Sequence, residues 1–178
     1  RNDWRDGGRF AESWRKPGRG NRTYITSKET TLELVKAFDQ GLENLRDRRI
    51  APAIGLGPTR RQMRPVLWRS KLSIVLFKAN MVAAQKLLTS GGLAQAYVLA
   101  RDNSEEARGD MSSLTSEFRI TIAAVDKLAR MSDAFARPDT RGRLVALGAP
   151  LKNIKVRTVG LLKDAAGLSI GFNASDGD

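Results

Sequence analysis

Apolar side chains recur every three or four residues in two long segments, and this spacing places them on one face of an α-helix. In the first segment they are Leu32, Val35, Phe38, Leu42 and Leu45. In the second they are Leu114, Phe118, Ile122, Val125, Leu128 and Phe135. A helix with one apolar face must pack against other elements, so the pattern favours a helical bundle.

A third segment is more uniformly apolar and predicts the central helix of that bundle. We expect this helix over residues 65–89, with Pro65 near its start and Gly91 and Gly92 just beyond its end. It is apolar on nearly all sides, which is typical of a helix buried on most faces. Its basic residues argue against a membrane span, which needs about 20 mostly apolar residues.

The C-terminal part of the chain shows a different pattern. β-Branched residues and a Lys-Asp-Ala-Ala-Gly sequence predict a two-stranded hairpin over residues 154–172. The expected fold class is mainly α: a helical bundle with a long central helix (65–89), an extended basic N-terminal arm and a C-terminal β hairpin. We expect the arm over 1–24, the bundle core over 25–137, and a basic linker, the hairpin and an acidic tail over 138–178.

Positive charge is concentrated in blocks along the chain. The 178 residues carry 31 Lys and Arg against 19 Asp and Glu, a formal net charge of +12. In the strongest block, over 46–71, Asp47 is the only acidic residue. Guanidinium groups bind phosphate oxygens in a bidentate manner, so we interpret this block as a nucleic-acid-binding site; the alternative is a solvated surface with local ion pairs. Its basic residues are Arg46, Arg48, Arg49, Arg60, Arg61, Arg64, Arg69 and Lys71.

A secondary basic patch is expected further along the chain. Its residues are Arg137, Arg141, Arg143, Lys155 and Arg157. In a strand, Lys155 and Arg157 share one face, so both would point to solvent or to a ligand. Edge-strand lysines also protect a sheet from aggregation, and the pattern is equally compatible with that role.

The N-terminal arm is unusual because it combines basic residues with aromatic ones. The aromatic residues are Trp4, Phe10, Trp14 and Tyr24. An ordinary solvated tail has little use for such side chains. We therefore expect the arm to dock on its own core, on a neighbouring subunit or on stacked bases.

The sequence contains no His and no Cys, which excludes several familiar catalytic and metal-binding arrangements. A thiol nucleophile, an imidazole acid or base, a disulfide and the usual zinc sites all need one of these residues. The remaining Asp, Glu, Lys, Ser and Tyr residues show no informative pairing. The sequence therefore predicts no enzyme, no catalytic residues, no metal and no cofactor.

Basic blocks without a catalytic arrangement favour a structural nucleic-acid-binding protein that works in multiple copies. It would be a coat or nucleocapsid-type subunit, or an architectural DNA or RNA binder, with mostly backbone contacts. The alternative is a helical protein–protein interaction or self-assembling scaffold module without nucleic acid. We expect a homo-oligomer whose arm contacts a neighbour, in the cytoplasm or in a virion or nucleoprotein assembly, without a transmembrane span.

Overall fold

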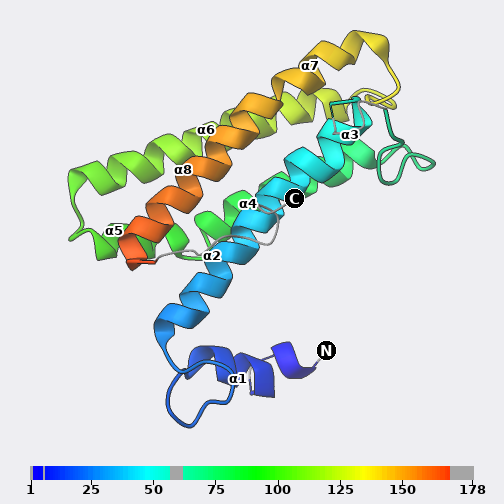
Figure 1. Cartoon of the computed structure of the whole chain (residues 1–178). Coiled ribbons are helices and arrows are strands. Elements are labelled where there is room, and N and C mark those ends of the chain that lie inside the picture. Colours follow the sequence, from blue (N-terminus) through cyan, green and yellow to red (C-terminus); the bar gives the residue numbers. More distant parts are fainter. Residues whose placement is uncertain (1, 6, 57–61, 169–178) are drawn as a thin grey trace.

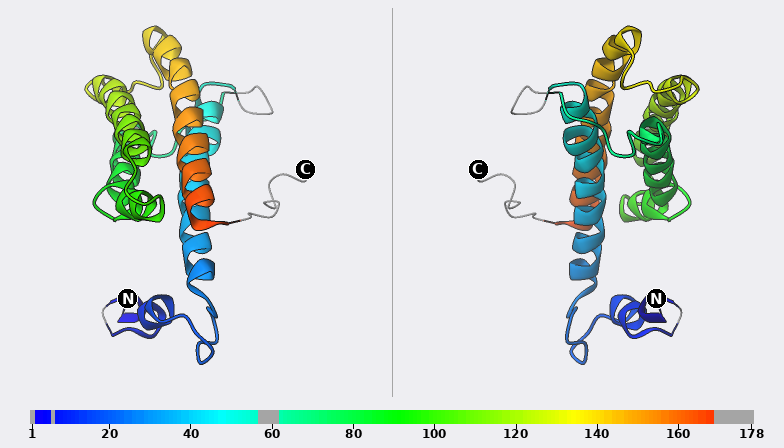
Figure 2. Two further views of the ribbon diagram at one scale, coloured as in Figure 1. Left: turned by 90° about the vertical axis from the view of Figure 1, so that its left-hand side faces the viewer. Right: turned by 90° about the vertical axis from the view of Figure 1, so that its right-hand side faces the viewer.

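The chain folds into a bundle of helices (Figure 1). The structure is a computed structural model that describes residues 2–5, 7–56 and 62–168. These residues form helices joined by turns and contain no strand, which confirms the mainly α class. Four long helices make up the bundle, and a short helical arm lies beyond one end of it (Figure 2).

The first helix of the bundle, α2 (Ser27–Glu43), begins at a side-chain cap. The Thr26 hydroxyl accepts a hydrogen bond from the backbone N–H of Glu29, so one of the unpaired amides at the helix start is satisfied. The helical run continues through a π-helical segment η2 (Asn44–Ile50) and the short α3 (Ala51–Ala53). These two segments carry three further apolar side chains, Leu45, Ile50 and Ala53, into the core.

The second long helix, α4 (Ser73–Leu88), begins later than the sequence pattern predicts. The expected start at residue 65 is wrong because Leu67 and Lys71 have φ angles of 62° and 58°. This left-handed backbone conformation is unfavourable for residues with a side chain and interrupts an α-helix. Residues 62–72 therefore form a largely exposed connection between α3 and α4.

A short helix, α5 (Leu93–Ala100), leads to the longest helix of the molecule, α6 (Glu105–Ala129). The Ser104 hydroxyl caps α6 by accepting a hydrogen bond from the Ala107 N–H at 3.2 Å. Leu114, Phe118, Val125 and Leu128 are buried on α6 at the helical spacing seen in the sequence, which confirms this part of the prediction. The expected last residue of the pattern, Phe135, lies in a turn beyond the end of α6. A single turn, η3 (Pro138–Thr140), then precedes the C-terminal helices.

The C-terminal part of the described chain is helical, and the predicted β hairpin is wrong. Helices α7 (Arg141–Ala146) and α8 (Gly148–Ala166) follow one another directly. The glycine that suggested a hairpin turn, Gly167, has a φ of 58° and ends α8 as a left-handed cap. Residues 169–172 of the expected hairpin lie outside the described residues. The buried side chains of α8 show the helical spacing: Leu151, Ile154, Thr158 and Leu162.

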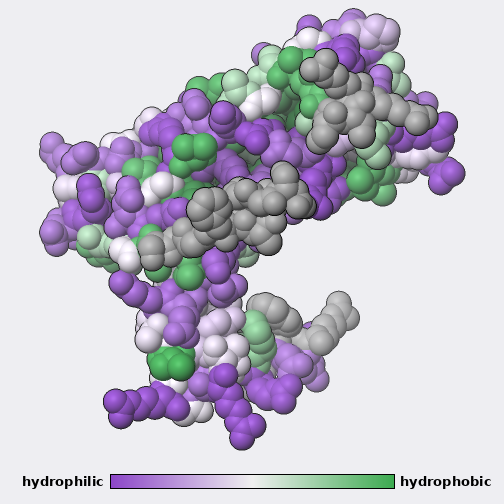
Figure 3. All heavy atoms as spheres, viewed as in Figure 1, coloured by the Kyte–Doolittle hydropathy of each residue, from purple (hydrophilic) through white to green (hydrophobic). Residues whose placement is uncertain are grey.

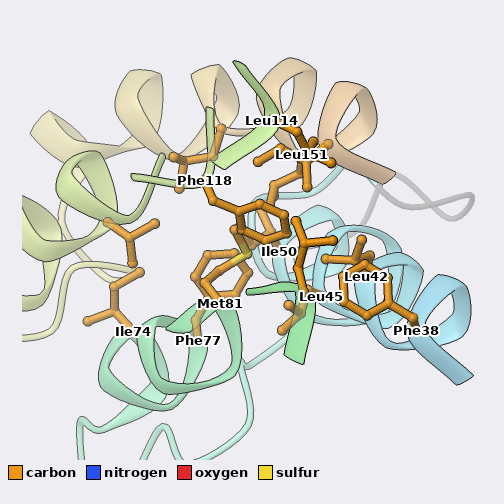
Figure 4. Close-up of a cluster of buried hydrophobic side chains, with 14 of the residues drawn as sticks. Phe38, Leu42, Leu45, Ile50, Ile74, Phe77, Met81, Leu114, Phe118 and Leu151 are labelled. Atoms are coloured by element: carbon orange, nitrogen blue, oxygen red, sulfur yellow. The ribbon is translucent and has the colours of Figure 1, made fainter. Parts of the chain in front are cut away.

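One apolar core joins the four long helices. Helix α8 packs against α2 and α6, and α6 also packs against α4. Phe118 of α6, Met81 of α4 and Leu151 of α8 are each at most 1% exposed, and all three point into the same cluster (Figure 4). Because hydrophobic burial is the main driving force of folding, this cluster fixes how the outer faces of the helices are arranged.

The N-terminal arm is not extended as expected. It forms one turn, η1 (Asn2–Trp4), and a helix, α1 (Arg9–Arg15). The rings of Phe10 and Trp14 lie four residues apart on α1 with centroids 6.1 Å apart, a spacing that stabilises a helix. The arm lies beyond the N-terminal end of α2 and apart from the rest of the bundle (Figure 2).

A charged contact also links α4 to α6. The Lys78 ammonium of α4 donates a hydrogen bond to the Asp126 carboxylate of α6, and the Arg130 guanidinium donates two more at 2.8 and 3.1 Å. These hydrogen bonds, that from Lys78 most of all, lower the pKa of Asp126 below its usual value. The charged form of this carboxyl is therefore favoured in the folded protein.

Truncation of the core should be costly. We expect Phe118→Ala to lower the free energy of unfolding by about 3–5 kcal/mol, because it removes a fully buried ring and leaves a cavity. The matched control is Val156→Ala on α8, whose side chain is 60% exposed and should change stability by less than about 0.5 kcal/mol. Urea denaturation followed by circular dichroism measures both. Similar losses in the two variants would contradict the described core.

The contact at Asp126 should make stability depend on pH. A carboxyl whose pKa is lowered by folding stabilises the protein above its usual pKa, and this contribution is lost as the pH falls through the lowered pKa. We expect Asp126→Asn to be less stable than the wild type at neutral pH and equally stable in strong acid. Thermal denaturation across this range measures the difference. The control is Asp102→Asn, which changes an exposed residue. A loss of stability in Asp126→Asn that does not vary with pH would refute the charged contact at Asp126.

Candidate functional site

Among the expected nucleic-acid-binding residues that the structure describes, Arg46 makes an ion pair. Arg46 lies on η2 and donates two hydrogen bonds to the neighbouring Asp47, at 2.6 and 2.8 Å. These hydrogen bonds raise the pKa of Arg46 and keep its guanidinium occupied. Arg48 and Arg49 follow on the same π-helical segment, and Arg49 lines a cavity of about 340 Å³ between α2 and α4.

The rest of this block lies on the connection between α3 and α4, or outside the described part of the chain. Arg64 and Arg69 lie against the Trp68 ring, with their guanidinium carbons 4.1 and 4.9 Å from its centroid. Lys71 is exposed and follows them in the chain. Two members, Arg60 and Arg61, lie outside the described residues.

The secondary patch is divided because its segment is helical. Lys155 faces α2, where its ammonium lies 2.5 Å from the Glu43 carboxylate and 3.4 Å from that of Asp39. Burial acts to lower the pKa of Lys155, but the hydrogen bond to Glu43 and the charge of Asp39 outweigh it and raise this pKa. Lys155 is therefore a structural cation between α8 and α2.

Arg157 faces a different helix, whereas a strand would have placed it beside Lys155. Its guanidinium donates hydrogen bonds to the Glu117 carboxylate of α6 and to the Ser113 hydroxyl at 3.3 Å. Two residues along an α-helix are separated by more than half a turn, which explains why the two cations point apart.

The other members of the patch lie at the start of the C-terminal helices. The Arg137 guanidinium donates hydrogen bonds to the Asp139 carboxylate at 2.8 and 3.0 Å, and these raise the pKa of Arg137. Arg141 and Arg143 lie on α7 and are exposed. Of the predicted patch, Arg143 contributes to the groove described next.

The aromatic residues of the arm pack mainly on one another and beside α2. The Trp14 and Tyr24 rings meet edge to face with centroids 5.3 Å apart. Together with Phe10 they line a cavity of about 510 Å³ whose other wall includes Leu34 of α2. These three rings therefore lie beside α2, and docking of the arm on the core, on a neighbouring subunit or on bases stays a prediction. For Trp4 only the backbone is described.

A groove of about 700 Å³ lies between α6 and the α7–α8 segment. We call it the α6–α8 groove. Its apolar lining includes exposed small or aliphatic side chains: Ile120, Ala123, Ala124 and Ala146. Ile120 is 61% exposed although it lies directly beside residues of the core on α6. An aliphatic side chain left in solvent next to alanines marks a face on which another molecule can pack closely.

Three exposed basic residues also line the α6–α8 groove: Arg119, Lys127 and Arg143. None of the ion pairs found among the described residues involves these side chains. The lining residues include no Asp or Glu. Arg143 also interacts electrostatically with Asp139, which lies outside the lining. The groove is therefore an apolar surface with a positively charged lining, and it suits a ligand that is both apolar and anionic.

Sequence reasoning found Arg143 but missed Arg119 and Lys127. The missed residues lie in the neutral middle of the chain, where acidic residues balance the basic ones in number. The available signal was a second stripe on α6, formed by Ile120, Ala123 and Lys127, at helical spacing but on the side away from the core. A count of charges along the chain cannot show which cations lack a partner.

No described residues form a group of three or more His, Cys, Asp or Glu side chains that could hold a metal ion. Within the same part of the chain, none of the helices is both long enough and apolar enough to cross a membrane.

The Tyr97 hydroxyl donates a hydrogen bond to Asp110 at 2.7 Å, and burial together with this contact raises the pKa of Tyr97 to about 12. This phenol therefore stays protonated at neutral pH.

Comparison with known proteins overturns the functional expectations. A family model named Imelysin, peptidase family M75, matches residues 1–156. No curated protein and no solved structure matches the chain. The predicted coat, nucleocapsid or architectural nucleic-acid-binding protein is therefore wrong, as are its alternative, a scaffold module, and the expectation of no enzyme, because the family is a peptidase family. Arg46, Lys155 and Arg157 form ion pairs with carboxylates of the chain itself, which agrees with this correction. Since the match covers most of its length, the chain belongs to the imelysin family.

Proposed function

We propose that this imelysin-family chain binds polypeptide in the α6–α8 groove, and so provides substrate binding for a peptidase-type function. The observation that carries the proposal is the combination of an exposed apolar lining with three cations that make none of the ion pairs found among the described residues. The family name adds the chemical class of the ligand, since a peptidase acts on polypeptides.

The apolar lining favours a helical occupant. Ala123 and Ala124 on α6 and Ala146 on α7 are small, so the backbone of a bound helix can approach closely. Ile120 then packs against apolar side chains of that helix, at the three- and four-residue spacing by which helices bind in grooves. Covering Ile120 removes an exposed aliphatic side chain from water, which favours binding.

The basic residues favour acidic side chains on the bound helix. Arg119 and Lys127 are eight residues apart on α6, which corresponds to about 12 Å at 1.5 Å per residue. Arg143 approaches from α7, on the opposite wall. A single small anion cannot contact cations that far apart, whereas a helix with Asp or Glu residues about two turns apart can.

The proposal assigns substrate binding, and no step of bond cleavage, to this groove. Its lining contains no carboxylate, and its only hydroxyl group belongs to Thr121, which is buried. The contact area is thus supplied by apolar side chains and the orientation by charge. This division of roles is common in polypeptide-binding grooves.

A synthetic amphipathic peptide tests the proposal. It carries a leucine face flanked by glutamates and a fluorescent label, and its fluorescence anisotropy reports binding to the whole chain. We expect the triple variant Arg119→Glu, Lys127→Glu, Arg143→Glu to weaken binding at least tenfold, since each exposed pair contributes up to about 1 kcal/mol. Ala124→Trp, which fills the groove, should weaken it similarly.

Two controls separate the groove from the overall charge of the protein. Lys152→Glu makes the charge change of a single groove substitution such as Lys127→Glu, at an exposed position on α8 that does not line the groove, and should leave the affinity nearly unchanged. A peptide with lysines in place of the glutamates should not bind. Equal loss of affinity in Lys152→Glu and the groove variants, or failure of the glutamate peptide to bind at all, would refute the proposal.

A further inference from the structure

The connection between α3 and α4 exposes an unusual number of large apolar side chains. They are Met63, Val66, Leu67, Trp68 and Leu72. We call residues 62–72 the Trp68 loop. Single exposed apolar residues are common on protein surfaces, but a continuous group of this kind marks a surface that meets something other than water. In the view of Figure 3, hydrophobic residues reach the surface at the end of the bundle that carries α3.

The exposure follows from the backbone of the loop. Left-handed φ angles at Leu67 and Lys71 prevent α4 from continuing toward its N-terminus, although the sequence has a helical pattern there. These are unfavourable conformations for residues with side chains, and such backbone strain is concentrated at functional positions in proteins. The apolar side chains are thus held in solvent by the loop instead of being buried along a helix.

The charges around the loop are almost all positive. Arg64, Arg69 and Lys71 belong to it, and the first two lie against the Trp68 ring. In the sequence, no Asp or Glu occurs between Asp47 and Asp102. Asp133 lines a cavity of about 290 Å³ beside Trp68. The loop therefore presents apolar side chains within a field of positive charge.

We propose that the Trp68 loop binds the surface of an anionic lipid membrane. In this arrangement, Trp68 lies at the level of the lipid headgroups, which tryptophan prefers. Leu67, Val66 and Leu72 enter the boundary between headgroups and acyl chains, while Arg64 and Arg69 contact lipid phosphates. The loop lies on the membrane and does not span it. The proposal does not depend on polypeptide binding in the α6–α8 groove.

A membrane fits this loop better than a protein partner does. The aliphatic side chains follow one another along an exposed connection, and the cavity beside Trp68 is small. A lipid surface needs no matching shape, only apolar side chains that can insert and cations that can meet phosphate. The combination of tryptophan, aliphatic residues and basic residues in one short exposed segment meets both needs.

Vesicle binding tests the proposal. The full chain is sedimented with vesicles of phosphatidylcholine mixed with phosphatidylglycerol, and with vesicles of phosphatidylcholine alone. We expect binding to the anionic vesicles only, and a marked decrease at high salt, where electrostatic attraction is screened. Leu67→Ser combined with Trp68→Ala should reduce binding at least tenfold, and so should Arg64→Gln combined with Arg69→Gln.

Matched variants elsewhere show whether the effect is local. Leu99→Ser and Val156→Ser change apolar residues that are 57% and 60% exposed, and Lys152→Gln removes an exposed charge from α8. All three should bind vesicles as the wild type does. Because every substituted residue is exposed, folding should persist, and circular dichroism checks this.

A fluorescence measurement places Trp68 directly. The chain contains three Trp residues, so Trp4→Phe combined with Trp14→Phe leaves Trp68 as the only one. Its emission should shift to shorter wavelength with anionic vesicles. Unchanged emission, or equal binding by the loop variants, would overturn the proposal. A shift caused by the glutamate peptide but not by vesicles would also overturn it, in favour of a protein partner.

Discussion

The packing of α8 between α2 and α6 is the constraint on which the rest of the structure depends. Its apolar residues complete the core, and two of its cations bind in opposite directions, Lys155 to carboxylates of α2 and Arg157 to Glu117 of α6. A buried or half-buried charge must be paired to be tolerated, so these contacts fix the rotation of α8 about its own axis. That rotation sets the α7–α8 wall of the groove.

The same contacts determine which positive charges remain for binding. A net charge of +12 suggests a polyanionic partner, but many of the cations are already paired with carboxylates on the same or a neighbouring helix. Several of the cations without such pairs lie along the α6–α8 groove and on the Trp68 loop, whereas others, such as Arg48 and Lys152, are exposed elsewhere. Both places combine positive charge with exposed apolar side chains, which explains why the total charge was a poor guide to function.

The sequence predicted the helices whose burial is one-sided. The apolar spacing of α2 and α6 is regular, and both helices are present. The sequence pattern gave a wrong prediction for α8. Its β-branched residues and Gly167 are locally compatible with a hairpin, and packing against two other helices stabilises the helix instead. The pattern also failed at Leu67, where the backbone conformation opposes a helical pattern. The groove was missed because pairing between helices, which leaves Arg119 and Lys127 free of ion pairs, is a property of the folded chain.

The central claim is that cations without ion pairs mark a ligand-binding surface where they lie beside exposed apolar side chains, as they do along the α6–α8 groove. Hydrogen–deuterium exchange of the whole chain with and without the glutamate-containing amphipathic peptide tests it most directly. The account predicts slower exchange over residues 119–128 and 141–150, which line the α6–α8 groove, and no change over 44–50. Protection over 44–50 with none in the groove would contradict it.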